Sequence, residues 1–138
     1  MKELAPYEHK VQYYETDQMA VVHHSNYIRW FEEARTYLMD AYGMGYDKME
    51  EAGIISPVLT ANAEYKTMTR FGDTVEIGIR LTAYNGIKMI VAYEVRDKET
   101  KEVRCIGTTS HCFMGRDGKL LSLKRSNKVF DEMFHSML

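Results

Sequence analysis

The sequence predicts an α+β fold in which a curved antiparallel β-sheet wraps around one long central α-helix. Two patterns predict it. Between residues 26 and 42, apolar residues recur at steps of three and four, as on one face of a helix: Tyr27, Trp30, Phe31, Ala34, Tyr37, Leu38 and Ala41. After Ser56 most of the chain instead alternates apolar and polar residues, which is typical of half-buried strands. One helix against one face of such a sheet buries both apolar surfaces.

The first half of the chain is expected to hold one strand and two helices. A strand covers roughly residues 7–14, and a polar turn then leads into the long helix at about 26–42. Ser25 is the expected N-cap of this helix, and Gly43 is a good residue to follow its C-terminus. Glu32 and Arg35 have the spacing of an ion pair on the solvated side. A short second helix is expected from Tyr46 to Ala52 and ends at Gly53.

The second half reads as strands with short connections. Three alternating segments predict strands, at residues 75–82, 89–95 and 102–114. Asn85-Gly86 between the first two of these predicts a two-residue type I′ hairpin turn. A terminal helix is expected from Ser126 to Met137. Because this sheet would keep one uncovered face and exposed edge strands, we expect a homodimer or a homotetramer.

Length and composition limit the class of protein. The 138 residues predict one domain, residues 1–138, and the net charge of −2 argues against a nucleic-acid partner. No apolar run reaches membrane-spanning length, and Met1–Pro6 lacks the apolar region of a signal peptide. Cys105 and Cys112 lie seven residues apart in one expected strand and therefore on opposite faces, which predicts two free thiols. We therefore expect a cytoplasmic protein.

Asp17 is the first candidate for chemistry. It lies in a polar turn just before the long helix, where unpaired N–H groups and the helix dipole favour developing negative charge. A carboxylate beside a helix start can serve a hydrolytic site, although a solvated turn residue is the alternative from position alone. The adjacent His23 and His24 do not converge on one metal ion, and no metal site is expected. No Gly-x-Ser-x-Gly motif is present.

Residues 15–27, Glu-Thr-Asp-Gln-Met-Ala-Val-Val-His-His-Ser-Asn-Tyr, resemble the signature of hotdog-fold acyl-CoA thioesterases. The family is that of 4-hydroxybenzoyl-CoA thioesterase, including the branch associated with the Tol–Pal system. The resemblance continues over most of the chain, through residues 30–35, 63–66, 70–73 and 107–111. It implies a hotdog fold and hydrolysis of acyl-CoA to free acid and CoA, with no cofactor.

The resemblance also implies roles for particular residues. Asp17 falls at the catalytic carboxylate, which acts as nucleophile or as general base toward water. His24 falls at the helix start, where a backbone N–H holds the thioester carbonyl oxygen and where the side chain is implicated in some members. Tyr27 and Trp30 fall near the acyl pocket. Ala20 stands where relatives carry Gly, so either the backbone is strained by about 1 kcal/mol or more, or the pocket is narrower.

The substrate would be an acyl-CoA, and an acyl carrier protein stays open as the alternative carrier. The phosphates of CoA require a basic edge, for which Lys88, Lys66 and Arg70 are candidates, although each can equally be an ordinary solvated charge. Two other functions remain open at this point. One is a hotdog hydratase or dehydratase acting on acyl thioesters, and the other is a non-catalytic acyl-CoA-binding module. Acyl chain length and aromatic preference are not predicted.

Overall fold

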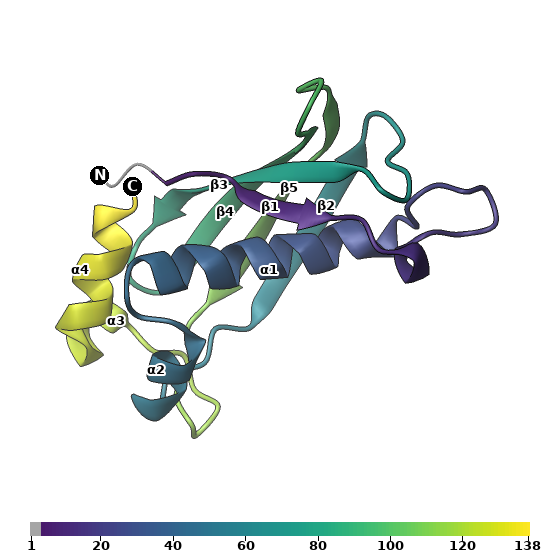
Figure 1. Ribbon diagram of the computed structural model, residues 1–138. Helices are drawn as coiled ribbons and strands as arrows, with labels where there is room; N and C mark the ends of the chain where they lie inside the picture. Colours follow the sequence, from purple (N-terminus) through teal and green to yellow (C-terminus); the bar gives the residue numbers. More distant parts are fainter. Residues whose placement is uncertain (1–3) are drawn as a thin grey trace.

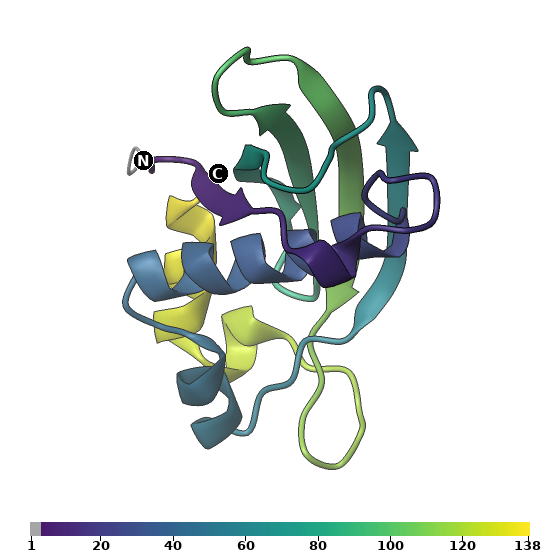
Figure 2. The ribbon, with the colours of Figure 1, turned by 45° about the vertical axis from the view of Figure 1, so that its right-hand side comes forward.

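A five-stranded antiparallel sheet curves around one long helix in the computed structural model, which describes residues 4–138 (Figures 1 and 2). The strand order is β1-β3-β4-β5-β2. The elements are β1 (Tyr7–Lys10), the 3-10 turn η1 (Tyr13–Glu15), α1 (Ser25–Ala41), α2 (Tyr46–Glu51), β2 (Val58–Tyr65), β3 (Thr74–Tyr84), β4 (Lys88–Asp97), β5 (Val103–Cys112), α3 (Leu123–Ser126) and α4 (Lys128–Ser136). The predicted α+β architecture is confirmed. Residues 1–3 of the N-terminal segment lie outside the described residues.

Helix α1 buries the predicted apolar face against the sheet. Trp30, Phe31 and Ala34 are fully buried, and the Phe31 ring stacks on Tyr93 of β4 at a centroid distance of 4.2 Å. The predicted N-cap is wrong by one residue, because α1 begins at Ser25 itself. The imidazole of His23 takes the capping role: its Nδ1 accepts from the Ser25 backbone N–H at 3.2 Å and lies 2.8 Å from the Ser25 hydroxyl.

The first strand is shorter than predicted. Pairing of β1 with β3 ends at Lys10, and residues 13–15 form a 3-10 turn rather than further strand. The reason is Glu15, which turns inward and accepts hydrogen bonds from groups on three different segments. A continued strand would carry Glu15 roughly 20 Å from His9, at about 3.3 Å per residue, and so out of reach of that donor. The remaining predicted strands appear at the expected places, preceded by β2.

The β3–β4 connection is not the predicted type I′ turn. That turn requires positive φ at both central residues, and Gly86 has φ of +90°, whereas the described non-glycine residues with positive φ are Ala20 and Lys101. Asn85 instead accepts hydrogen bonds through Oδ1 from the backbone N–H groups of Ile87 and Lys88, at 3.0 and 2.8 Å. The result is a three-residue loop closed by the Asn85 side chain.

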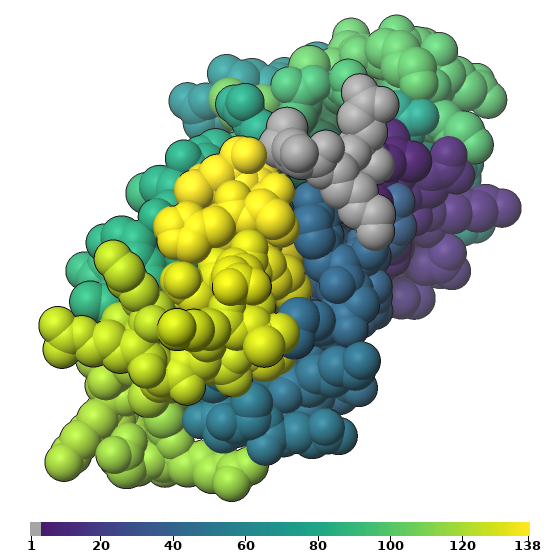
Figure 3. All heavy atoms as spheres, turned by 90° about the vertical axis from the view of Figure 1, so that its left-hand side faces the viewer, coloured from purple at the N-terminus to yellow at the C-terminus, as the bar shows by residue number. Residues whose placement is uncertain are grey.

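The C-terminal segment forms two helices rather than one. Asn127 interrupts the predicted helix and caps α4, because its side chain accepts from the Phe130 backbone N–H at 3.1 Å. Phe134 of α4 packs on Tyr84 of β3 and on Phe113, which follows β5, each at a centroid distance of 5.3 Å. Helix α4 therefore closes the end of the core beside α1, as the space-filling view shows (Figure 3).

Arg35 is buried, so the predicted surface pair with Glu32 is wrong. Its guanidinium donates to the Tyr93 hydroxyl at 3.0 Å, and the chain of hydrogen bonds continues through Thr109 to His111. Burial, followed by the nearby Arg35 charge, lowers the pKa of His111 to about 4. A chain of hydrogen-bonded polar side chains therefore crosses the core between the second half of α1 and the sheet.

Both cysteines are free, as predicted, and both are buried. Burial raises the pKa of the Cys105 thiol to about 12, which makes this group a poor nucleophile near neutral pH. Between residues 4 and 138, none of the helices combines the length and the apolar character that a membrane crossing needs.

Candidate active site

Asp17 lies in a tight loop that returns the chain from η1 to α1 and that projects beyond the sheet in Figure 1. Thr16 and Val22 form an isolated antiparallel bridge at its neck. Within it, the Asp17 backbone N–H donates to Val21 O at 3.0 Å, and Asp17 Oδ1 accepts from the Met19 N–H at 2.8 Å. The carboxylate is half-buried and keeps its second oxygen free of any partner among the described residues. The Asp17 carboxylate is therefore held in place by a hydrogen bond, and no ion pair among residues 4–138 neutralises its charge.

Ala20 adopts φ of 62°, so of the two expected effects of alanine in place of glycine, the backbone strain is the one present. The loop requires a left-handed residue here, because the Ala20 N–H must turn back to Asp17 O at 2.9 Å. A side chain in this region costs roughly 1–2 kcal/mol. Ala20 itself is exposed, so its methyl group strains the backbone and does not fill a buried pocket.

The start of α1 lies directly beyond this loop. The first backbone N–H groups of α1 already have acceptors. Ser25 N–H donates to His23 Nδ1, Asn26 N–H to His23 O, and Tyr27 N–H to His24 O. The His24 N–H, in contrast, has no acceptor among residues 4–138. The His24 imidazole is exposed and lies against His23 at a centroid distance of 4.2 Å. A single free donor therefore marks the positive end of the helix.

A groove of about 320 Å³ opens beside this donor. Its lining comes from the loop, the first turn of α1, and the end of β2 with the residues after it: Met19, Val21, Val22, His24, Tyr27, Tyr65, Lys66, Thr67 and Met68. The Tyr65 hydroxyl donates to His24 O at 3.3 Å, and the Tyr27 hydroxyl lies 2.9 Å from Thr69 Oγ1. Burial raises the pKa of both tyrosines, so both hydroxyls stay protonated at neutral pH.

The structure brings together only part of the predicted site. His24 and Tyr27 line the groove, and Asp17 lies in the loop that forms one wall. Trp30 does not reach the groove: it is fully buried and its indole N–H donates to Glu15 Oε2 at 2.7 Å. Tyr65 is a groove residue that the sequence analysis did not single out, because it lies 41 residues after His24 in the chain and meets it only through the fold.

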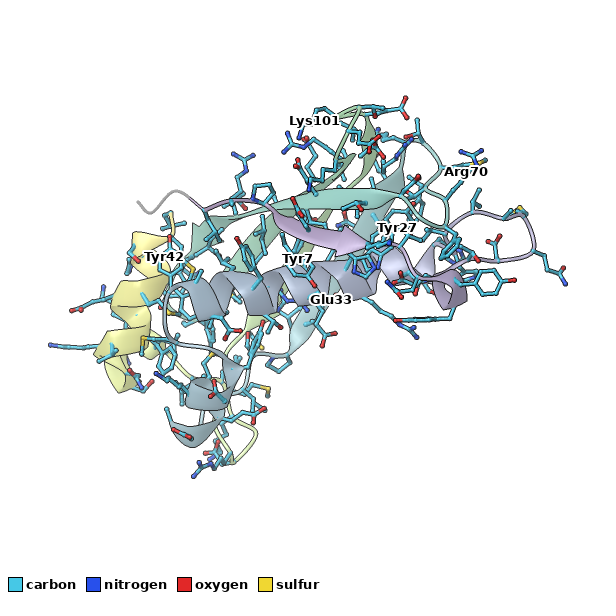
Figure 4. All side chains as sticks on the ribbon, in the orientation of Figure 1. Tyr7, Tyr27, Glu33, Tyr42, Arg70 and Lys101 are labelled. Atoms are coloured by element: carbon cyan, nitrogen blue, oxygen red, sulfur yellow. The ribbon has the colours of Figure 1, made fainter. Side chains whose placement is uncertain are left out.

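The three basic candidates do not share one edge. Lys66 lines the groove, and Arg70 lies at the same end of the molecule, where Figure 4 labels it. Lys88 of β4 pairs with Cys112 of β5. Tyr65 of β2, which directly precedes Lys66, pairs with Cys105, which is also in β5. Seven residues of β5 therefore separate the two lysines, or roughly 23 Å at 3.3 Å per residue. In one protomer Lys88 cannot join Lys66.

No group of three or more His, Cys, Asp or Glu side chains converges as a metal site within residues 4–138. The chemistry available at the groove is that of a carboxylate, a helix N-terminus, a backbone donor and an imidazole. Residues 11–134 match the thioesterase-like superfamily, and this match spans most of the chain. The chain belongs to the thioesterase-like superfamily.

One relative and two solved structures match most of this chain. YneP of Bacillus subtilis strain 168, provisionally named an acyl-CoA thioesterase, is 36% identical over 110 residues, which are 80% of this chain and 79% of YneP. The crystal structure of a DHNA-CoA thioesterase from Staphylococcus aureus is 30% identical with a TM-score of 0.90, covering 96% of this chain and 89% of that one. A hypothetical protein of Aquifex aeolicus is 33% identical with a TM-score of 0.86, covering 93% and 97%.

These matches confirm the predicted thioesterase family and the hotdog fold. The assignment to the Tol–Pal-associated branch stays a prediction. So do the roles of the individual residues, since a shared fold does not by itself assign them.

Proposed function

We propose that this member of the thioesterase-like superfamily hydrolyses acyl-CoA thioesters to the free carboxylic acid and CoA. The observation that carries the proposal is the His24 N–H at the start of α1, which has no acceptor among the described residues and lies next to a loop that presents the Asp17 carboxylate. A thioester needs a nucleophile or base and a donor for the oxyanion, and this corner of the molecule supplies both. Removal of one oxyanion donor typically lowers the rate by about 100- to 1000-fold.

In this proposal the thioester carbonyl oxygen accepts from the His24 N–H, where the helix dipole also favours the growing negative charge. Asp17 then acts by one of two routes. As nucleophile, its oxygen attacks the carbonyl carbon, the C–S bond breaks, CoA leaves as the thiolate, and water hydrolyses the resulting mixed anhydride. As general base, it takes a proton from water while the water oxygen attacks the carbonyl carbon, after which the C–S bond breaks and CoA leaves as the thiolate. Oxygen-18 labelling in a single turnover separates the routes, because only the first places an enzyme oxygen in the product.

The groove suggests how the substrate lies. Its wall of Met19, Val21, Tyr27 and Met68 suits an apolar or aromatic acyl group. The Staphylococcus aureus neighbour is named for DHNA-CoA, whose acyl group is aromatic. We therefore include aromatic acyl-CoAs among the candidate substrates. Lys66 and Arg70 are the proposed partners of the CoA phosphates at this end of the molecule. An acyl carrier protein remains a second candidate carrier.

We also propose that the active form is a homodimer or homotetramer. Strand β2 is an edge strand whose residues are exposed along nearly its whole length. Antiparallel pairing with the same strand of a second copy would cover it. The same pairing would bring the hairpin end of one sheet, which carries Lys88, toward the groove end of the other. We further propose one domain over residues 1–138 and a cytoplasmic location.

The test is thiol release from short, long and aromatic acyl-CoAs, with wild type and Asp17→Asn compared. We expect turnover on at least one substrate and a loss of roughly 100-fold or more in the variant, because the amide can neither attack nor take a proton. Equilibrium binding of the same acyl-CoA should be retained, which separates lost chemistry from lost affinity. Tight binding without turnover in wild type would instead favour the acyl-CoA-binding module, and reversible addition of water to an enoyl-CoA would favour a hydratase.

A further inference from the structure

Glu15 is a buried carboxylate that lies two residues before Asp17. Only 4% of its surface is exposed, and its two oxygens accept three hydrogen bonds: from His9 Nε2 at 2.8 Å, from the Gln12 backbone N–H at 2.7 Å, and from Trp30 Nε1 at 2.7 Å. A buried carboxylate is strongly unfavourable unless it is bonded in this way. These three donors come from β1, the start of η1 and α1, so the side chain ties three segments together.

The backbone of the same residue ties the two ends of the Asp17 loop. Glu15 O accepts from the His23 N–H at 2.9 Å and from Asn26 Nδ2 at 2.8 Å. Asn26 is itself buried, and its Nδ2 also lies 3.3 Å from His23 O. His23 immediately precedes the free His24 N–H. One residue therefore connects the segment that carries Asp17 to the segment that carries the proposed oxyanion donor.

We infer that Glu15 is a positioning residue, which fixes the Asp17 carboxylate relative to the His24 N–H. This inference rests on the proposed thioesterase function. Glu15 does not line the groove and has no role in the chemistry itself. Its effect arises because any rotation of Glu15 moves both its side-chain anchor and its carbonyl, and so shifts Asp17 against the helix start. Catalysis is sensitive to such shifts, since a misplacement of about 1 Å can lower the rate roughly 100-fold.

Glu33 provides a matched control on the other side of the same imidazole. Its Oε1 lies 3.5 Å from His9 Nδ1 and accepts from the Tyr7 hydroxyl at 2.8 Å (Figure 4). Unlike Glu15, it is partly exposed, and it has no bond to the Asp17 loop. Loss of either carboxylate removes a charge next to His9. Only loss of Glu15 disturbs the loop.

The experiment compares kcat and KM of wild type, Glu15→Gln, Asn26→Asp and Glu33→Gln on the best acyl-CoA, well below the lowest melting temperature. In Glu15→Gln the amide NH₂ meets an N–H donor in either orientation, at Trp30 or at Gln12. In Asn26→Asp an acceptor replaces the donor that faces Glu15 O and His23 O. We expect both variants to lose roughly 10- to 100-fold in kcat with KM within about threefold, and Glu33→Gln to keep kcat within about twofold.

The inference is overturned if Glu15→Gln and Glu33→Gln have the same kcat, or if the loss in Glu15→Gln disappears when the rate is corrected for the folded fraction. The Asn26→Asp variant perturbs the same carbonyl without removing the Glu15 carboxylate, and its rate is corrected for the folded fraction in the same way. Absence of turnover in wild type would overturn the proposed function and this inference with it. Normal turnover, a large loss in Asp17→Asn and no loss in Glu15→Gln would overturn the inference alone.

Discussion

Ala20 adopts a left-handed backbone, with φ of 62°, in the middle of the loop that carries Asp17. We predict that Ala20→Gly stabilises the protein by up to about 1 kcal/mol, because glycine adopts this conformation without the clash of a Cβ, less the greater entropy of glycine in the unfolded chain. Chemical denaturation measures the change. Turnover should be retained, since the Ala20 side chain makes no contact that the proposed chemistry requires.

The matched control for this prediction is Ala52→Gly. Ala52 follows α2 with φ of −77°, a conformation that alanine adopts freely, so the same substitution should destabilise the protein there. Equal effects at the two positions would contradict the assignment of strain to Ala20.

For single residues, the sequence predicted position along the fold better than side-chain contacts. Asp17 was predicted to precede the long helix from its position along the chain, and the resemblance placed His24 at the helix start; His24 directly precedes α1, and Asp17 lies in the loop before it. The resemblance placed Trp30 near the acyl pocket. Its indole N–H is instead bonded to Glu15, because a buried carboxylate requires donors and the nearest come from distant segments.

Gly107 decides how closely α1 approaches the sheet. A Cβ built at this position would lie 2.5 Å from both Phe31 Cε2 and Asn62 O. Phe31 cannot easily move, since it is fully buried and stacks on Tyr93. We therefore predict that Gly107→Ala destabilises the protein by roughly 1–3 kcal/mol or more, as a lower midpoint of urea unfolding will report.

Gly78→Ala is the control on the same sheet. A Cβ there meets nothing nearer than Glu94 O at 3.9 Å, which is an ordinary contact. Its midpoint should therefore stay close to that of wild type. If both variants unfold at the same midpoint, the close contact at Gly107 is not what positions the helix.

Element types and order followed from periodicity, whereas some element ends did not. The strands after Ser56 were predicted because alternation depends only on which face is buried. The first strand ended early and the β3–β4 loop took another form, since in both cases one side chain, Glu15 or Asn85, bonds to backbone or buried groups. Such competing hydrogen bonds leave the hydrophobic pattern unchanged.

For the molecule as a whole, the exposed edge of β2 predicts self-association through that strand. Ala61 lies near the centre of β2, so antiparallel self-pairing would bring the two copies of this residue close together. We predict that Ala61→Lys raises the dimer Kd by roughly tenfold or more through like-charge repulsion. Sedimentation over a range of protein concentrations measures the shift toward monomer.

Leu120→Lys is the corresponding control. Leu120 is exposed and lies outside β2, so the same kind of substitution should leave self-association through β2 unchanged. Equal weakening by both variants would contradict pairing along β2.

The sequence alone determined what depends on neighbours along the chain. The periodicity of residues 26–42 and of the later strands gave the architecture, and the position of Asp17 before the long helix gave a candidate carboxylate, which the resemblance to hotdog thioesterases then favoured. These features follow from local backbone geometry, which a sequence pattern carries directly.

Only the tertiary structure decided which polar groups share a buried space. It turned Glu15 inward, buried Arg35 on the inner face of α1 and separated Lys88 from Lys66 along β5. Each outcome depends on donors, acceptors or strand registers from segments far apart in the chain. The physical reason is that a buried polar group is stable only where distant partners satisfy it, and no local pattern records those partners.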